Sequence, residues 1–313
     1  MQIRKYILTL QDNNQIVMQR ILDRYAYYIP SWGAMLRFFL LYLAGIVVGA
    51  VLMAISTLAF GEQFSDGYAM IVAYPLQFIF IILYVRKKSR KACSCGETGY
   101  RLDNSNFGSL GGPAMVFLVA VATIALVFVN DWLGTLLPPI PSSLKSILEG
   151  SLSDSLWVNL LVAAVLAPIV EEWLCRGQVL RGLLCRGVKP VWAILASAAF
   201  FAVIHANPWQ AVVALTAGAF MGFIYYRTGS LKLTVLVHMI NNAGSVICSN
   251  IGTLKEAGSF KEVIPVQDYY VIVLLSAAII IAAVCLTASK VPASTTRGSF
   301  ERLDGELEKS ETV

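Results

Sequence analysis

Long apolar runs alternate with short polar segments along most of the chain. A helix needs roughly 20 residues to cross a bilayer, and most of the runs approach that length. The runs are Met35–Phe60, Tyr68–Val85, Pro113–Leu136, Leu156–Leu174 (extending to Leu184), Val191–His205, Ala211–Tyr226, Leu231–Ile251 and Tyr269–Leu286. The pattern predicts an all-α fold, a polytopic membrane bundle of about eight transmembrane helices within residues 31–290.

Lys and Arg gather in short clusters between these runs, most densely at 86–91. Clusters of this kind mark the cytoplasmic side of a membrane protein. Alternation from 86–91 places Cys185–Lys189, Arg227–Lys232 and Lys290 inside, and Glu62–Asp66 and Asn130–Ser143 outside. The helix count agrees with the charge rule, and both termini are predicted to be cytoplasmic.

The two ends of the chain differ from the membrane domain. Within residues 1–30, apolar side chains recur at helical spacing beside arginines. This segment is therefore either an amphipathic helix on the inner membrane surface or a solvated leader. Residues 291–313 are polar and charged, which predicts a disordered cytoplasmic tail.

Composition supports a membrane protein and excludes other classes. Of the 313 residues, 57% are hydrophobic and 14% charged, whereas a soluble domain carries about 25% charge. The net charge of +5 comes from clusters between apolar runs, so nucleic acid is not an expected partner. The six cysteines predict no disulfide framework, and Cys93 and Cys95 lack the second pair that a zinc site would need.

Ionisable residues within the apolar runs are the candidates for function. A charge at the centre of a membrane helix costs about 2.5–3.5 kcal/mol on insertion scales, so it is retained for a reason. Residues four apart share a helix face, so Glu172 is predicted to pair with Arg176, which leaves Glu171 for chemistry. In the alternative interpretation, both acids only neutralise Arg176 and Arg181.

The chain has two histidines, and both lie in or at the ends of apolar runs. His238 and Asn242 are four residues apart and are expected to share a helix face. At 1.5 Å per residue, Glu171 and His205 lie roughly 21–23 Å from the inner side and His238 roughly 13 Å. These depths permit a shared site.

Glu171, His205, His238 and Asn242 suit the hydrolysis of an amide. That reaction needs a base to deprotonate water, a proton donor for the leaving amine, and donors for the developing oxyanion. Neither a Gly-x-Ser-x-Gly elbow nor a His-Glu-x-x-His zinc signature is present. A carboxylate and two histidines also match a zinc ligand set, so Glu171, His205 and His238 are alternative metal ligands. We favour a reaction without a cofactor.

Three motifs occur in order: Glu171-Glu172-x-x-x-Arg176, Phe201-x-x-x-His205 and His238-x-x-x-Asn242. Together they resemble the signature of the CAAX-protease and bacteriocin-processing family, the type II CAAX prenyl endopeptidases, over roughly residues 150–250. The resemblance implies an intramembrane endopeptidase of eight helices. Glu171 with His205 would activate water, His238 with Asn242 would hold the oxyanion, and Glu172, Arg176 and Phe201 would support the site.

The resemblance implies a peptide or protein substrate at the membrane, with or without a lipid group. Family members act on prenylated proteins in eukaryotes, and on signalling or bacteriocin peptides, or in self-immunity, in prokaryotes. Short loops favour a bacterial cytoplasmic membrane. Three alternatives stay open: a zinc-dependent protease, a non-catalytic immunity or scaffold protein that sequesters a peptide, and a transporter with a proton relay. The sequence contains no internal repeat of the kind that many transporters have.

Overall fold

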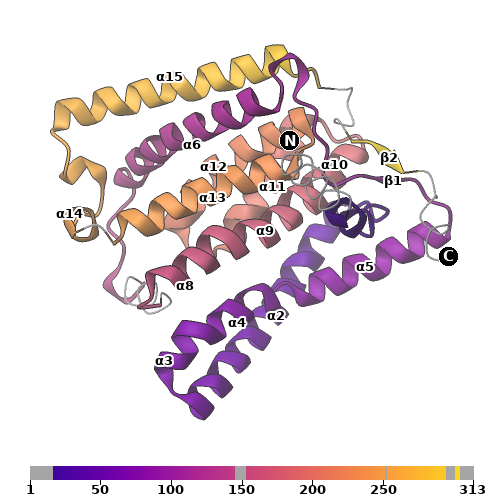
Figure 1. The fold of residues 1–313 in the computed structure, drawn as a ribbon, viewed down its shortest axis with the longest axis horizontal. Helices are drawn as coiled ribbons and strands as arrows, with labels where there is room; N and C mark the ends of the chain where they lie inside the picture. The colour runs from indigo at the N-terminus through magenta and orange to yellow at the C-terminus, as the bar shows by residue number, and fades with distance from the viewer. Residues whose placement is uncertain (1–16, 145–152, 251, 294–299, 304–313) are drawn as a thin grey trace, which may run out of the picture.

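The protein is a bundle of long helices (Figure 1), described by a computed structural model for residues 17–144, 153–250, 252–293 and 300–303. Within these ranges, seven helical spans are long and apolar enough to cross a membrane. A shorter apolar helix, α11 (Pro190–Ile204), adds to them. The predicted all-α membrane bundle of about eight helices is confirmed.

Two N-terminal spans form a hairpin along one edge of the bundle (Figure 1). The first is α2 (Trp32–Phe60), and the second consists of α3 (Glu62–Phe64), the π-helix η1 (Ser65–Ala69), α4 (Met70–Leu76) and α5 (Ile79–Ser94). The second span is interrupted at Gln77 and Phe78, between α4 and α5 and shortly after Pro75. Proline lacks the N–H that a helix interior uses and its ring crowds the preceding turn, so it weakens the end of α4.

The remaining spans form the rest of the bundle. They are α6 (Gly112–Thr135), the span of α8 (Leu156–Leu161), η3 (Val162–Leu166), α9 (Ala167–Glu172), η4 (Trp173–Leu180) and α10 (Arg181–Cys185), then α11, α12 (Pro208–Thr228), α13 (Leu231–Cys248) and α15 (Val266–Lys290). Short helices lie between them: the 3-10 helix η2 (Gly108–Leu110), α14 (Gly252–Glu256) and the 3-10 helix η5 (Phe260–Glu262). Of the seven spans, 156–185 is covered most by its neighbours. It therefore provides the most secluded position for polar side chains.

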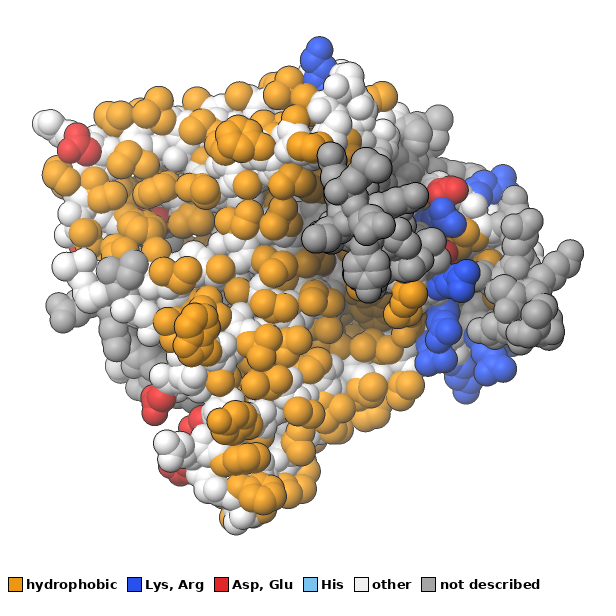
Figure 2. Space-filling model, viewed as in Figure 1, with side chains coloured by type: hydrophobic (Ala, Val, Ile, Leu, Met, Phe, Trp, Pro, Cys, Tyr) orange, Lys and Arg blue, Asp and Glu red, His pale blue; other side chains and the backbone are white. Residues whose placement is uncertain are grey.

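Most of the Lys and Arg side chains visible in Figure 2 gather at one end of the bundle. The end of α5 that carries the basic run 86–91 is called the basic end below. This run was predicted to be a loop, but it forms the last turns of α5, because Lys and Arg are good helix formers and the first glycine follows only at Gly96.

Segments from both ends of the described chain pack at the basic end. Residues 17–23 are helical, with apolar side chains exposed on that helix. Burial raises the pKa of the nearby Asp23 carboxyl, and the charge of Arg101 offsets part of the shift. Most of the predicted disordered tail lies outside the described residues, but Arg302–Leu303 forms β2 and pairs antiparallel with β1 (Gly99–Tyr100). A two-residue strand has no periodicity that a sequence could reveal.

Glycines set the closest helix contacts. Gly45 and Gly49 of α2 face the backbone of Gln77 and Ala73, and Gly218 and Gly222 of α12 face α11. Small residues one turn apart let helix backbones approach closely in a membrane. The contact of Gly45 with the Gln77 backbone therefore sets how closely α2 packs against the second span of the hairpin.

Gly45→Ala is expected to destabilise the protein by about 1–3 kcal/mol, the usual cost of overpacking. A Cβ at Gly45 would overlap the carbonyl oxygen of Gln77, which is backbone and cannot move aside. Gly33→Ala in the same helix is the matched control, since a Cβ there meets nothing within 4 Å. Thermal unfolding in detergent measures both. Equal midpoints for the two variants would contradict the close contact.

Candidate active site

A buried ion pair lies at the centre of the bundle. Arg176 Nη1 donates to Glu172 Oε1 over 2.6 Å, and both side chains are fully buried. Arg176 Nη2 also donates to the Gly218 carbonyl over 2.9 Å, and the guanidinium lies 4.7 Å above the Phe201 ring centroid. The pairing predicted from the four-residue spacing is present, and the guanidinium joins η4 to α12 and α11.

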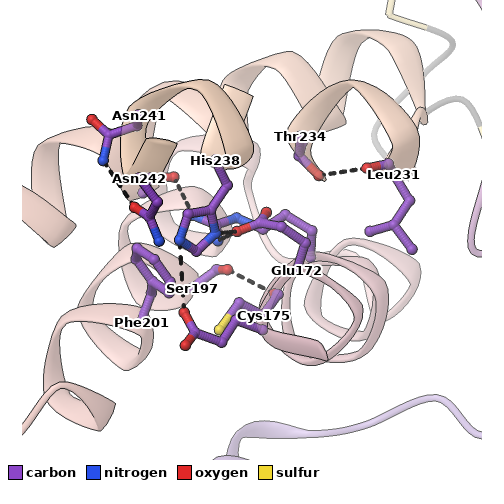
Figure 3. A network of polar contacts seen from close by, with 12 residues as sticks. Glu172, Cys175, Ser197, Phe201, Leu231, Thr234, His238, Asn241 and Asn242 are labelled. Atoms are coloured by element: carbon purple, nitrogen blue, oxygen red, sulfur yellow. Dashed lines mark hydrogen bonds and ion pairs between the residues drawn. The ribbon is translucent and has the colours of Figure 1, made fainter. Parts of the chain in front are cut away.

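His238 links the two neighbouring glutamates. Its Nδ1 lies 3.0 Å from Glu172 Oε1, and its Nε2 lies 3.9 Å from Glu171 Oε2. Because an ionised carboxylate only accepts, Nδ1 is the donor to Glu172. Figure 3 shows His238 and Asn242 on the same face of α13, directed towards Glu172 and Phe201. The nitrogen that remains for chemistry is therefore Nε2, on the side of Glu171.

The two oxygens of Glu171 have different surroundings. The Tyr74 hydroxyl of α4 donates to Oε1. Oε2 is buried and has no hydrogen-bond partner among the described residues. A buried carboxylate oxygen without a donor is costly and rare in native proteins, and such exceptions are found at catalytic sites. Oε2 is thus the atom best placed to accept a proton.

Phe201 connects the second histidine to the first. The His205 ring lies 4.8 Å from the Phe201 ring and the His238 ring lies 5.3 Å from it, both edge-on. Nδ1 of His205 lies 2.7 Å from the Phe201 carbonyl oxygen and is its donor, since a carbonyl only accepts. In the described part of the chain, no hydrogen bond or ion pair joins His205 to Glu171. That Glu171 and His205 activate water together stays a prediction, and His238 is the histidine in contact with Glu171.

Asn242 stabilises an irregular stretch of the central span. In the π-helix η3 each carbonyl accepts from the N–H five residues on, as Val162 does from Ala167. The next bond in that register would run from residue 168 to Ala163, but Pro168 has no N–H. The Asn242 amide donates to the Ala163 carbonyl over 2.8 Å and replaces the missing donor. This π-helix lies directly before Pro168, where the missing N–H loosens the helix.

Arg181 does not pair with either glutamate. Its guanidinium is fully buried and donates to the backbone carbonyls of Gly177, Ala26, Tyr100 and Tyr28. The interpretation that both acids neutralise Arg176 and Arg181 is therefore wrong for Arg181. Carbonyl dipoles from three chain segments satisfy this cation, which anchors residues 26–28 to the basic end.

Metal ligands do not come together in the described ranges. No group of three His, Cys, Asp or Glu side chains there could hold a metal ion. The alternative ligands Glu171, His205 and His238 do not form such a group among the described residues. Cys93 and Cys95 are free thiols.

The structure brings together five of the seven predicted site residues, namely Glu171, Glu172, Arg176, Phe201 and His238. His205 joins them through Phe201, and Asn242 lies beside them on α13. Sequence reasoning missed Tyr74, which comes from the N-terminal hairpin. A tyrosine followed by proline inside an apolar run is the only sequence signal for it, and this signal is weak.

The fold and the site define a multi-pass membrane protein with a carboxylate and histidine cluster buried among its helices. Residues 153–244 match the family model described as type II CAAX prenyl endopeptidase Rce1-like. The match includes all three motifs and confirms the predicted family for this segment. The N-terminal hairpin, α6 and α15 lie outside it. No curated protein and no solved structure matches the chain.

Proposed function

We propose that this protein is an intramembrane endopeptidase in which Glu171 activates a water molecule. The observation that carries the proposal is the buried Oε2 of Glu171, which has no donor among the described residues and lies 3.9 Å from His238 Nε2. The family match supports a protease of the CAAX type. The glutamate mechanism and the substrate are the parts that we add.

In the proposed reaction, Glu171 Oε2 takes a proton from water as the water oxygen attacks the scissile carbonyl carbon. The carbonyl oxygen becomes an oxyanion, which His238 and Asn242 of α13 would stabilise. Glu171 then returns the proton to the leaving amine as the C–N bond breaks. His205 directly follows α11, and its Nδ1 donates to the Phe201 carbonyl. It would provide a further polar group for water or substrate.

The Glu172–Arg176 pair would support this reaction indirectly. Glu172 accepts from both Arg176 and His238, so it fixes the rotation of the histidine ring. Nδ1 of His238 donates to Glu172, so a donation from Nε2 to an oxyanion would need a hydrogen on each ring nitrogen. Glu172 lies on the Nδ1 side of the ring and Glu171 on the Nε2 side.

An apolar cavity supports a lipidated or membrane-embedded substrate. It has a volume of about 390 Å³ and lies between α2 and α11. Trp32, Leu36, Phe39, Phe200 and Val203 line it, with other apolar residues of the same helices. Phe200 directly precedes the site residue Phe201, so the cavity and the site share helix α11.

We further propose that the basic end faces the cytoplasm of a bacterial cell, with both termini on that side. The gathering of Lys and Arg side chains at this end in Figure 2 supports this orientation under the positive-inside rule. Substrate peptides would then enter from the membrane or from the cytoplasmic face.

Terminal-peptide mass spectrometry on membranes tests the proposal. Cells would express wild type or Glu171→Gln at matched levels, and new peptide termini would be compared. Termini that only wild type produces would establish proteolysis, and the flanking residues would define the substrate class. If the two membranes have the same termini while both proteins are folded, the protein is a sequestering immunity or scaffold protein instead.

Chelation distinguishes the glutamate mechanism from the zinc alternative. We expect cleavage by the purified protein to retain its rate after treatment with EDTA and dialysis, because no group of three metal-ligating side chains comes together among the described residues. The rate of cleavage of a peptide with a mapped cut site is the measurement. Loss of activity that Zn²⁺ restores would establish the metal-dependent mechanism.

A further inference from the structure

The Tyr74 hydroxyl binds the proposed base from outside the segment that matches the family model. It donates to Glu171 Oε1, although 97 residues separate the two in sequence. Among the described residues, no other side chain donates a hydrogen bond to this carboxylate. The N-terminal hairpin therefore reaches the candidate site through one side chain.

The position of Tyr74 is built into the hairpin. Pro75 follows it directly, and the helix breaks after Leu76. The Tyr74 ring packs on Phe78, at 6.1 Å between centroids, on the other side of that break. Gly45 of α2 touches the backbone of Gln77 inside the break. The proline break and the glycine contact together fix where the hydroxyl lies.

The hydrogen bond makes the two carboxylate oxygens of Glu171 unequal. With Oε1 held by Tyr74, Oε2 is turned towards His238 Nε2 and has no other partner. Without the tyrosine, the carboxylate would rotate more freely, because the terminal torsion of Glu has a broad energy profile. A general base works only if its free oxygen stays within hydrogen-bond reach of the proton it takes.

We propose that Tyr74 is a positioning residue of the active site, which holds the Glu171 carboxylate with Oε2 directed to the reacting water. The inference rests on the proposed function, since it assigns Glu171 the role of base. Through Tyr74, the N-terminal hairpin would contribute to the reaction, although it lies outside the segment that matches the family model.

Tyr74→Phe tests the inference, because it removes the hydroxyl and keeps the ring that packs on Phe78. We expect kcat to fall about 10- to 100-fold, the range for losing a hydrogen bond to a charged group. KM should stay near the wild-type value, since Tyr74 orients the base rather than the substrate. The substrate is a peptide that spans a cut site found by terminal mass spectrometry, and rates are divided by the folded fraction.

Tyr42→Phe is the matched control. Tyr42 packs on the same Phe78 ring, at 5.3 Å between centroids, but makes no hydrogen bond to Glu171 among the described residues. It should keep wild-type kcat and KM. Equal losses of kcat in the two variants, or a wild-type kcat for Tyr74→Phe, would overturn the inference.

Glu171→Gln in the same assay separates this inference from the proposed function. If Glu171→Gln cleaves as fast as wild type, the glutamate mechanism fails whatever Tyr74 does. If Glu171→Gln is inactive and Tyr74→Phe keeps full activity, the mechanism stands and only the role of Tyr74 is wrong.

Discussion

Glu171→Gln is expected to lower kcat about 10²- to 10⁴-fold, the contribution of a general base. The amide has nearly the same shape as the carboxylate but cannot take a proton from water. Its oxygen can still accept from Tyr74, so the local packing is kept. Kinetics on a peptide with a mapped cut site, together with a melting curve in detergent, measure the effect.

A second measurement makes the result specific to this side chain. The melting midpoint of Glu171→Gln should stay close to that of wild type, because the Glu172–Arg176 pair is untouched. Turnover near the wild-type rate would show that another group is the base. A large fall in midpoint would show that Glu171 holds the fold, as a structural residue would.

Glu172→Ala and Arg176→Ala should each lower the free energy of unfolding by about 3–5 kcal/mol, because each leaves a buried charge without its partner. Both side chains are fully buried, and removal of Glu172 also takes away the acceptor of His238. Unfolding in detergent with a chemical denaturant measures the loss. The double variant Glu172→Leu with Arg176→Met should be more stable than either single variant, since no charge is left uncompensated.

Lys232→Ala is the control for this pair. Lys232 Nζ lies 3.0 Å from Asp103 Oδ2, but its side chain is 54% exposed. An exposed ion pair contributes about 0–1 kcal/mol, so the loss should be small. Equal losses for Lys232→Ala and Arg176→Ala would contradict the view that burial makes the central pair important.

Substitutions of the two adjacent glutamates are thus expected to have opposite effects on activity and stability. Glu172 Oε1 accepts from Arg176 and His238, and its Oε2, like that of Glu171, is buried without a hydrogen-bond partner among the described residues. Glu171 has one donor and a free oxygen beside His238. One variant should lose activity with its fold kept, and the other should lose the fold itself.

The helices and the Glu172–Arg176 pair could be predicted because they depend on local periodicity. Apolar runs of membrane length define spans, and a spacing of four residues puts two side chains on one helix face. An irregular helix near Pro168 is likewise a local effect, because the missing N–H is a property of the residue itself.

Contacts between distant segments could not be predicted in this way. His238 contacts both glutamates. Counting residues along the helices placed it about 8–10 Å nearer the basic end than Glu171. The count ignores helix tilt, for which the sequence carries no signal. Asn242 contacts Ala163 because a π-helix leaves that carbonyl without a donor. The register of such a turn depends on the surrounding packing.

The sequence by itself determined the class of fold, the three motifs and the residues whose burial in a membrane demands a function. The tertiary structure alone decided that Tyr74 holds Glu171, that His238 rather than His205 lies beside it, and that Arg181 binds carbonyls. The physical reason is the range of the interactions. Periodicity and spacing act within a few helical turns, whereas these contacts depend on how tilted helices meet across the bundle.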